Sequence, residues 1–203
     1  MSTAEQIVHV VDDDEAMRDS MSWLLEGEGY KVACHDSAGA FLAAWRSSLR
    51  GCIVLDVRMP EMSGLELQEK LDSIGSHLPV IFVTGHGDVP MAVAALKKGA
   101  FHFIEKPFND HDLVDLVEKA LAADRDRQRV AASRETIEAR LATLTQRERE
   151  VMELILEGKY NKVIADDLSI SMRTVEAHRS RIFDKMDVRS AVELAQLLTV
   201  LRT

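Results

Sequence analysis

The aspartate Asp56 directly follows the apolar run Cys52–Leu55, and Pro60 and Gly64 turn the chain soon afterwards. An apolar run of this length is typical of a buried strand in a parallel sheet. Open α/β sheets carry their functional groups at the carboxyl ends of the strands, so Asp56 stands where chemistry is expected. Taken alone, an aspartate at this position could also cap the next loop or helix.

Other polar side chains follow apolar runs in the same way, namely Asp12, Asp13, Thr84 and Lys106. Because the carboxyl ends of parallel strands share one edge of a sheet, we expect these side chains to meet Asp56. Carboxylate oxygens suit Mg²⁺, which also retains water and phosphate ligands. Such a cluster could support phosphoryl transfer to Asp56, with Thr84 and Lys106 each contacting one phosphoryl oxygen.

Apolar runs alternate with helical patterns five times in residues 1–123. The expected strands are Ile7–Val11, Lys31–His35, Cys52–Leu55, Pro79–Val83 and Phe101–Ile104, and the expected helices are Met17–Glu28, Ala38–Arg46, Gly64–Ile74, Val89–Lys98 and Asp110–Ala123. Five such repeats predict a parallel sheet with helices on both faces and right-handed crossovers. We interpret Asp14 and Glu15 as the N-cap and a first-turn acid of the first helix.

The composition is that of a globular chain long enough for two modest domains, with 203 residues, 46% apolar and 29% charged. No apolar run approaches the ~20 residues that span a bilayer, and the N-terminus lacks a signal-peptide pattern. We therefore expect a cytoplasmic protein with no membrane partner. Cys34 and Cys52 are expected to be reduced core residues, neither disulfide-bonded nor metal ligands.

The net charge of −9 is unevenly distributed along the chain. Residues 1–123 hold 10 Lys and Arg against 20 Asp and Glu, residues 124–143 hold 5 against 4, and residues 144–203 hold 10 against 10. An acidic part joined to a neutral part suggests two separate roles. The acidic balance argues against non-specific nucleic-acid binding by the whole chain, but it allows a local basic face.

Residues 5–123 resemble the receiver domain of two-component response regulators. The segments that carry the resemblance are Val10-Val11-Asp12-Asp13, Leu55-Asp56-Val57-Arg58-Met59-Pro60, Thr84-Gly85 and Lys106-Pro107-Phe108. The resemblance implies a flavodoxin-like α/β fold with a five-stranded parallel sheet of order 2-1-3-4-5. It also makes Asp56 the phosphoacceptor and assigns Mg²⁺ to Asp13, Asp56 and the Arg58 carbonyl, with Asp12 acting through water.

The same resemblance makes Thr84 and Lys106 partners of the phosphoryl group, and Thr84 and Phe103 a pair that shifts on phosphorylation. His86 could tune the lifetime of the acyl phosphate or could be a solvated loop histidine. The shift would reshape the surface of the helix Val89–Lys98 and the fifth strand, with Val89, Met91, Ala95 and Lys98 among its outward residues. We expect a two-fold symmetric homodimer to form there on phosphorylation.

Residues 124–142 contain neither proline nor glycine and are rich in helix formers. Apolar residues recur every seven positions, at Leu116, Ala123, Val130, Ile137 and Leu144. Arg127 and Arg134 interrupt a second seam, which makes a poor coiled coil. The sequence therefore predicts a long helical linker that extends the fifth helix of the first domain.

Residues 143–203 predict an all-α domain with a helix-turn-helix. Capping boxes at Thr145–Glu148 and Ser190–Glu193 open two helices, Asn161 can cap another, and Ser171 can cap a helix that runs to Met186. The buried stripe of that last helix is expected at Val175, Ile182 and Met186. Its outer side carries Arg173, Glu176, Ala177, Ser180 and Asp184.

This domain resembles the LuxR-type DNA-binding domain over nearly all of residues 143–200. The resemblance is carried by Leu144–Val151, Gly158, Asn161-Lys162, Ile164-Ala165, Leu168, Ser171 and Thr174–His178. It implies that the helix from Ser171 enters the major groove. The expected DNA contacts are Lys162, Arg173, Thr174, Glu176, Ala177, Arg179, Ser180, Arg181 and Lys185, with Lys162, Arg173 and Lys185 on phosphates.

The two domains together resemble response regulators of the NarL/FixJ family, on its FixJ-like branch. The resemblance implies a non-enzymatic transcription factor with four partners: a sensor histidine kinase, promoter DNA, RNA polymerase and a second copy of itself. An aspartyl-phosphate phosphatase or mutase would need an acid where this chain has Arg58. An RNA-binding antiterminator is disfavoured by the Ser171–Arg181 pattern, and a phosphate-independent regulator by the complete acidic cluster. The stimulus, the kinase, the operator, the sign of regulation and the nature of the resting state stay open.

Overall fold

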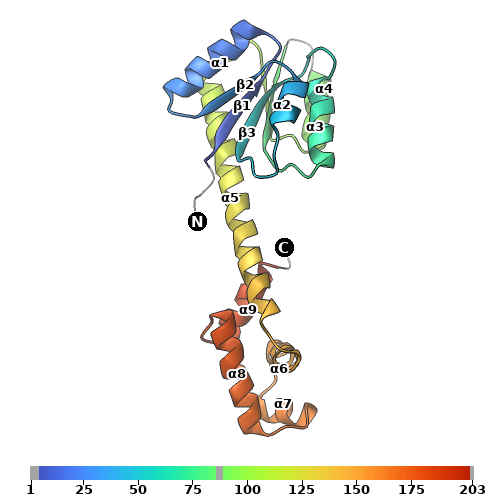
Figure 1. Ribbon diagram of the computed structural model, residues 1–203, viewed down its shortest axis with the longest axis vertical. Coiled ribbons are helices and arrows are strands. Elements are labelled where there is room, and N and C mark those ends of the chain that lie inside the picture. Colours follow the sequence, from blue (N-terminus) through green and yellow to red (C-terminus); the bar gives the residue numbers. More distant parts are fainter. Residues whose placement is uncertain (1–4, 86–88, 202–203) are drawn as a thin grey trace. The chain divides into compact units, whose positions relative to one another are not determined.

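A parallel sheet of five strands, in the order β2-β1-β3-β4-β5, lies at the centre of the first unit of the computed structural model (Figure 1). The structure describes residues 5–85 and 89–201, in two compact units, Met1–Arg127 and Gln128–Thr203. The strands are β1 Ile7–Val11, β2 Val32–His35, β3 Gly51–Asp56, β4 Val80–Thr84 and β5 His102–Glu105. The predicted fold and strand order are thus confirmed.

Helices cover both faces of this sheet, because successive side chains of each strand point to opposite sides. The helices of this unit are α1 Glu15–Gly27, α2 Ala38–Ala44, α3 Gly64–Ser73, α4 Val89–Lys97 and α5 Asp110–Ala142. On β3, Cys52 and Val54 pack with α1 and α5, whereas Ile53 and Leu55 pack with α2, α3 and α4. All four side chains are fully buried, as expected for a central parallel strand.

The helix α1 begins two residues earlier than its apolar pattern predicts. The Asp14 carboxylate accepts hydrogen bonds from the backbone N–H groups of Ala16 and Met17, which confirms Asp14 as the N-cap. Glu15 lies in the first turn, as predicted.

Gly51 allows the start of β3 to lie against β1. Its φ is +124°, and an added Cβ would lie 1.8 Å from the carbonyl oxygen of Ile7. The buried Asp124 carboxylate of α5 accepts the Gly51 N–H at 3.0 Å. Asp124 also accepts a hydrogen bond from the Gln6 side chain at 2.8 Å, so α5 is tied to the amino-terminal edge of the sheet.

The prediction that both cysteines are core residues was half wrong. Cys52 is buried, and burial raises the pKa of its thiol to about 12. Cys34 is exposed, because β2 is the edge strand of the sheet and one of its faces is less covered.

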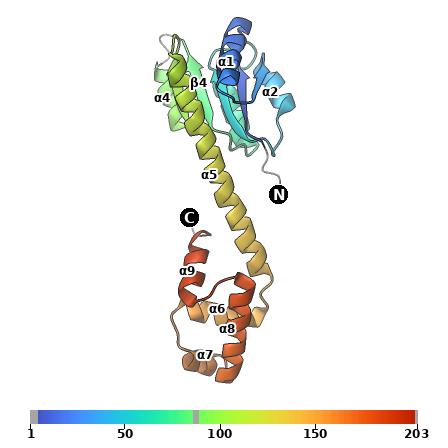
Figure 2. The ribbon, with the colours of Figure 1, turned by 90° about the vertical axis from the view of Figure 1, so that its left-hand side faces the viewer.

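The predicted helical linker is confirmed, since α5 is one continuous helix of 33 residues (Figure 2). Its seven-residue apolar repeat serves two different cores. Leu116 is buried in the core of the first unit, whereas Ile137 and Leu144 are buried in that of the second. Between them Val130 is 51% exposed, so the repeat does not build one continuous seam within the chain.

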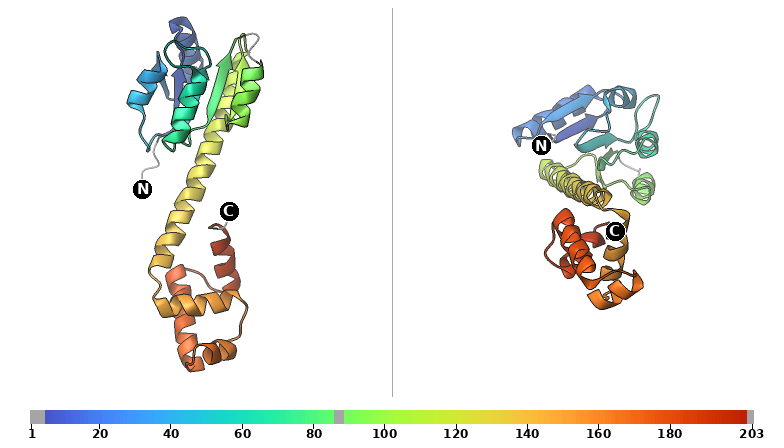
Figure 3. Two further views of the ribbon diagram at one scale, coloured as in Figure 1. Left: turned by 90° about the vertical axis from the view of Figure 1, so that its right-hand side faces the viewer. Right: turned by 60° about the horizontal axis from the view of Figure 1, so that its bottom comes forward.

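Four further helices surround the core of the second unit, α6 Gln146–Leu156, α7 Asn161–Asp167, α8 Met172–Met186 and α9 Ala191–Thr199 (Figure 3). Thr145 and Glu148 form the predicted capping box, and Ser171 caps α8 through the Thr174 N–H. The predicted buried stripe of α8, at Val175, Ile182 and Met186, is also confirmed.

Two predicted caps in this unit differ from the structure. The N-cap of α7 is Tyr160, without a side-chain hydrogen bond, and Asn161 is already helical. The Ser190 hydroxyl accepts the Glu193 N–H, but the Glu193 carboxylate accepts the N–H of Arg189 instead of that of the N-cap. Both helices are still fixed in the core, because α7 buries Ile164 and Ala165 and α9 buries Leu194.

Among the described residues, no helix is both long enough and apolar enough to cross a membrane.

Candidate functional site

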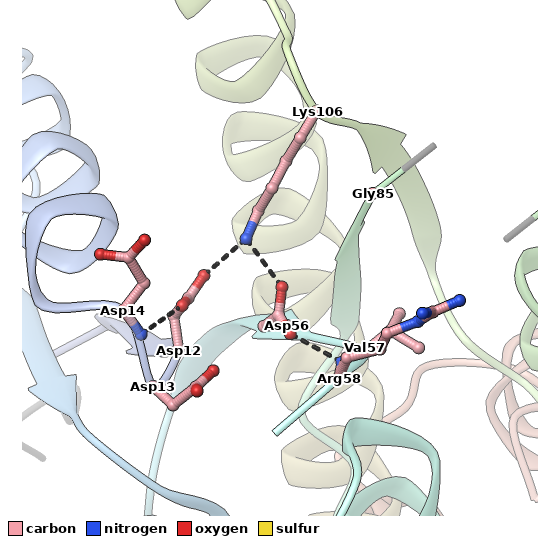
Figure 4. Close-up of a pocket in the computed structure, with 8 residues that line it drawn as sticks. All are labelled: Asp12, Asp13, Asp14, Asp56, Val57, Arg58, Gly85 and Lys106. Atoms are coloured by element: carbon pink, nitrogen blue, oxygen red, sulfur yellow. Dashed lines mark hydrogen bonds and ion pairs between the residues drawn. The ribbon is translucent and has the colours of Figure 1, made fainter. Parts of the chain in front are cut away.

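An open pocket of about 370 Å³ lies at the carboxyl edge of the sheet of the first unit (Figure 4). It is lined by Asp12, Asp13, Asp14, Asp56, Val57, Arg58, Gly85 and Lys106, which we call the acidic pocket. Asp12 directly follows β1, Asp56 is the last residue of β3, and Lys106 directly follows β5. The strand ends thus bring together Asp12, Asp13, Asp56 and Lys106, as the sequence predicts.

Lys106 reaches across the acidic pocket to both buried carboxylates (Figure 4). Its Nζ donates to Asp12 Oδ2 at 2.8 Å and to Asp56 Oδ1 at 2.7 Å. The Lys106 backbone N–H donates to the Thr84 carbonyl at 2.7 Å, which fixes where the lysine leaves the sheet. The ammonium therefore offsets the repulsion between two carboxylates that would otherwise be buried side by side.

The remaining carboxylate oxygens are held by the backbone. Asp56 Oδ2 accepts the Arg58 N–H at 2.6 Å, and Asp12 Oδ1 accepts the Asp14 N–H at 2.9 Å. The Arg58 side chain extends away from the Asp56 carboxylate (Figure 4). The Asp56 carboxylate is thus fixed in orientation at the pocket floor, while the pocket remains open above it.

Burial and pairing act in opposite directions on the two central groups. Burial raises the pKa of Asp56, and this outweighs the lowering effect of the Lys106 ammonium. Burial alone would lower the pKa of Lys106, but its hydrogen bonds to Asp12 and Asp56 outweigh it and raise that pKa. Lys106 therefore remains a cation at neutral pH, and any other cation has to compete with it for the two carboxylates.

The chemistry of the acidic pocket fits a hard divalent cation. Asp12, Asp13 and Asp56 offer carboxylate oxygens, and the backbone carbonyl of Arg58 is a further hard donor at the pocket wall. Among the described residues, however, no three His, Cys, Asp or Glu side chains are already arranged around a common metal position. The Lys106 ammonium lies between Asp12 and Asp56 instead, and it would have to move for a metal to bind both.

Of the predicted switch pair, Thr84 lies beside the acidic pocket, next to its lining residue Gly85. Thr84 is the last residue of β4 and is buried, and its hydroxyl donates to the Gly85 carbonyl at 3.3 Å. Gly85, and not Thr84, lines the pocket. Phe103 is half-buried on the edge strand β5 and packs against the core that α2, α3 and α4 share with the sheet. His86 lies outside the described residues.

The predicted nucleic-acid-binding residues lie on α7 and α8 of the second unit. Those that are exposed are Lys162, Arg173, Glu176, Ala177, Ser180 and Arg181. Thr174 and Arg179 are half-buried; the Thr174 hydroxyl bonds that of Ser171, and the Arg179 guanidinium lies over the Phe183 ring. Lys185 is half-buried as well, and its Nζ pairs with the Glu148 carboxylate. The structure thus places all nine predicted residues at the surface or its edge, and it ties Lys185 to the fold through Glu148.

Sequence reasoning missed one side chain beside the acidic pocket. Arg18, one turn into α1, donates from Nη1 to the Asp12 carbonyl at 2.7 Å and so braces the loop that carries the carboxylates. An arginine in the first turns of a surface helix is also common as a solvated residue, and nothing in its spacing marks it. Tyr160, 82% exposed beside α7, likewise carries no sequence signal of a role.

Comparisons with known proteins match both units. Residues 8–118 match the family model "Response regulator receiver domain", and residues 142–198 match "Bacterial regulatory proteins, luxR family". The transcriptional regulatory protein FixJ of Azorhizobium caulinodans is 48% identical over 94% of this chain and 90% of its own length. The C4-dicarboxylate transport transcriptional regulatory protein DctR of Rhodobacter capsulatus is 48% identical over 94% of this chain and 98% of its own.

Solved structures of whole proteins are similar as well. The response regulator StyR is 41% identical, with a TM-score of 0.88 over 97% of this chain and 99% of its own. Full-length FixJ from B. japonicum is 42% identical, with a TM-score of 0.62 over 98% of both chains. The family consists of transcriptional regulators and not of enzymes. This chain belongs to the NarL/FixJ family, as a DNA-binding two-component response regulator of the FixJ/LuxR type.

Proposed function

We propose that phosphorylation of Asp56 by a sensor histidine kinase favours a dimer of this chain that binds promoter DNA and regulates transcription. The observation that carries this proposal is the Asp56 carboxylate, fixed at the floor of an open acidic pocket within 2.7 Å of the Lys106 ammonium. The same chain carries a LuxR-type DNA-binding unit. The kinase and its target would meet in the cytoplasm, and RNA polymerase would respond to the bound dimer.

In the proposed reaction an Asp56 carboxylate oxygen attacks phosphorus and the bond to the donor nitrogen or oxygen breaks. Asp12, Asp13, Asp56 and the Arg58 carbonyl would hold Mg²⁺, which supplies positive charge for the phosphoryl oxygens. Lys106 exchanges a carboxylate for a phosphoryl oxygen, and the Thr84 hydroxyl donates to another. The Arg58 N–H continues to hold the second Asp56 oxygen, so the nucleophile stays oriented.

The phosphoacceptor is tested with acetyl phosphate and Mg²⁺, and the mass of the intact protein is followed over time. We expect one phosphoryl group on the wild type and none on Asp56→Asn. The matched control is Asp14→Asn, which removes a carboxylate from the same pocket but leaves an N-cap on α1, and it should still be labelled. Equal labelling of Asp56→Asn would overturn the assignment.

We place the dimer surface on α4 and β5, with one change from the sequence prediction. Ala95, expected to face outward, is 1% exposed, so it packs inward instead. Among the described side chains of α4, the large apolar ones that are exposed are Val93 and Leu96, and Lys98, just after the helix, pairs with Glu69. The side chains of Val89 and Met91 lie outside the described residues.

Sedimentation with and without beryllofluoride, a mimic of the phosphoryl group, tests the dimer. The wild type should be a monomer alone and a dimer with the mimic. Leu96→Asp should remain a monomer in both, whereas Ile74→Asp, which changes another exposed apolar residue at the end of α3, should dimerise normally. A monomeric wild type at concentrations where DNA affinity still rises would favour release of an interdomain contact over dimerisation.

We propose that α8 enters the major groove and that its exposed face reads DNA. Arg173→Ala should weaken binding to all duplexes and flatten the salt dependence, as loss of one phosphate contact does. Glu176→Ala should change the preferred sequence, by ~1–3 kcal/mol at one base pair. Binding to RNA of equal length should be weaker than to duplex DNA, and a preference for RNA would favour an antiterminator instead.

A further inference from the structure

Two neighbouring side chains of α6 hold the turn and the carboxyl end of the helix-turn-helix that α7 and α8 form in the second unit. The Arg147 guanidinium donates to the carbonyl of Leu168, the C-cap of α7, at 2.5 Å. The Glu148 carboxylate accepts from Lys185 Nζ, in the last turn of α8, at 2.7 Å. We call Arg147, Glu148 and Lys185 the α6 clamp.

The Glu148 end of the α6 clamp is buried, and one of its carboxylate oxygens accepts two hydrogen bonds. Glu148 is 2% exposed, and its Oε2 also accepts the Thr145 N–H at 2.9 Å. Lys185 Nζ makes a second bond to the carbonyl of Thr143 at 2.9 Å. The hydrogen bond from Lys185, aided by that from Thr145, lowers the pKa of Glu148 to about 2, so the Glu148 carboxylate stays ionised at neutral pH.

This arrangement separates Lys185 from the other basic residues of the predicted DNA-binding surface. A lysine that contacts a phosphate must present its ammonium to the DNA, yet the Lys185 ammonium is already bonded to the buried Glu148 carboxylate and to the Thr143 carbonyl at the surface, although 32% of its side chain is exposed. Moving it outward would leave the Glu148 carboxylate buried without its cation, which is unfavourable. Arg181, by contrast, is exposed on the same helix.

The α6 clamp adds hydrogen bonds of defined direction to the apolar packing that holds α8, and apolar packing alone does not fix a direction. Val175, Ile182 and Met186 bury the inner side of α8, but apolar contacts alone allow a helix to turn or slide by small amounts at low cost. Hydrogen bonds at fixed distances oppose such motion. A helix that reads base edges needs this precision, because a bidentate contact fails when its donors shift.

We propose that Arg147 and Lys185 are positioning residues that do not touch DNA. Lys185 ties the last turn of α8 to Glu148 of α6, and Arg147 of α6 holds the start of the turn that precedes α8. Together they set the orientation of α8 and so its sequence preference. This inference rests on the proposed reading of DNA by α8. It predicts that loss of the Lys185 ammonium lowers affinity for preferred DNA while leaving non-specific affinity intact.

The test uses the full chain with beryllofluoride and Mg²⁺, and two fluorescent duplexes of equal length. One duplex is selected by the wild type from a random pool, the other is unrelated, and anisotropy gives both affinities at several salt concentrations. Lys185→Met should bind the selected duplex about tenfold more weakly, comparable to one mismatched base pair. Its affinity for the unrelated duplex and its salt slope should be unchanged, and Lys185→Arg should restore much of the preference.

The matched control is Arg181→Met, an exposed α8 residue predicted to contact DNA. It should weaken binding to both duplexes and reduce the salt slope by about 0.9, as loss of one phosphate contact does. If Lys185→Met behaves like Arg181→Met, Lys185 is a phosphate contact and the α6 clamp proposal is wrong. If Lys185→Met binds as the wild type does, the proposal is also wrong.

A second variant distinguishes loss of sequence preference from a folding defect. Lys185→Met combined with Glu148→Gln removes the unpaired carboxylate and keeps an acceptor for the Thr145 N–H, so it should remain folded by circular dichroism and show the same lost preference. A double variant that is folded and keeps wild-type preference would refute the inference. If the wild type itself selects no preferred duplex, the proposal that α8 reads DNA sequence is wrong, and the positioning role of Lys185 is wrong with it. In that case an unchanged salt slope in Lys185→Met would still show that Lys185 does not contact a phosphate.

Discussion

Replacing Lys106 with methionine should strengthen Mg²⁺ binding in the unphosphorylated protein. The Lys106 ammonium lies between the Asp12 and Asp56 carboxylates, at 2.8 and 2.7 Å, where it competes with a metal for the same oxygens. Methionine has a similar length and no charge, so it removes the competitor and leaves the carboxylates in place.

The expected gain follows from the two hydrogen bonds that a metal must displace in the wild type. Hydrogen bonds to charged groups contribute about 1.5 kcal/mol each at the low end of their range, or about 3 kcal/mol together. The Lys106 side chain is 22% exposed, so when the ammonium moves away from the carboxylates it forms hydrogen bonds with water that replace part of this energy. Discounting by half leaves about 1.5 kcal/mol, which corresponds to roughly tenfold tighter binding.

Isothermal titration calorimetry with MgCl₂ at pH 7.5 and constant ionic strength measures this gain. Lys106→Met should bind about tenfold more tightly than the wild type, and Asp56→Asn more weakly. The gain should shrink at lower pH, because without Lys106 the raised pKa of Asp56 rises further and protons compete with the metal. Weaker binding by Lys106→Met than by the wild type would show that the lysine supports the metal site instead of opposing it.

Two other predictions concern the stability of the first unit, which tryptophan fluorescence reports mainly through Trp45, because Trp45 packs against the core whereas Trp23 is 81% exposed. His9 is buried, and burial together with the charge of His35 lowers its pKa to about 4, so its neutral form is favoured in the folded state. The unfolded chain binds this proton near pH 6.5, so the contribution of His9 to stability is complete above that pH and is lost as the pH falls towards 4. Urea unfolding should therefore show that the free energy of unfolding falls by about 1 kcal/mol from pH 7.5 to 5.5, and His9→Gln should reduce this loss. Gly51→Ala should cost more than ~3 kcal/mol because its Cβ would meet the Ile7 carbonyl, whereas Gly39→Ala in α2, with no atom within 4 Å of the added Cβ, should be neutral or stabilising. A pH-independent His9 contribution, or a mild Gly51→Ala, would contradict these contacts.

The fold of the first unit was predictable because each strand is a short apolar run that ends in a polar residue. The strand Ile7–Val11 was predicted with its observed bounds, and Asp56 at the end of β3 was located from the run that precedes it. Local signals also gave Asp14, Thr145 and Ser171 as helix caps, because a cap depends on a few neighbouring residues.

What the sequence could not supply were choices between partners far apart in the chain. The Lys185 ammonium could face a phosphate or a carboxylate, and only the fold brings Glu148, 37 positions away, within 2.7 Å. Asp124 reaches Gly51 across 73 positions, and no local pattern marks it as buried. Cys34 was predicted to be in the core from its apolar strand, but that strand is at the predicted edge of the sheet, and its apolar run does not show which of its side chains other elements cover.

The link from Asp56 to DNA binding is tested most directly by one titration. Fluorescence anisotropy of a duplex selected by the protein gives the affinity before and after acetyl phosphate and Mg²⁺, in the wild type and in Asp56→Asn. Phosphorylation should raise the affinity of the wild type by ~10²-fold, because two linked DNA-binding units then act at one site, and should leave Asp56→Asn unchanged. An equal rise in Asp56→Asn, or no rise in fully phosphorylated wild type, would contradict control of DNA binding through Asp56.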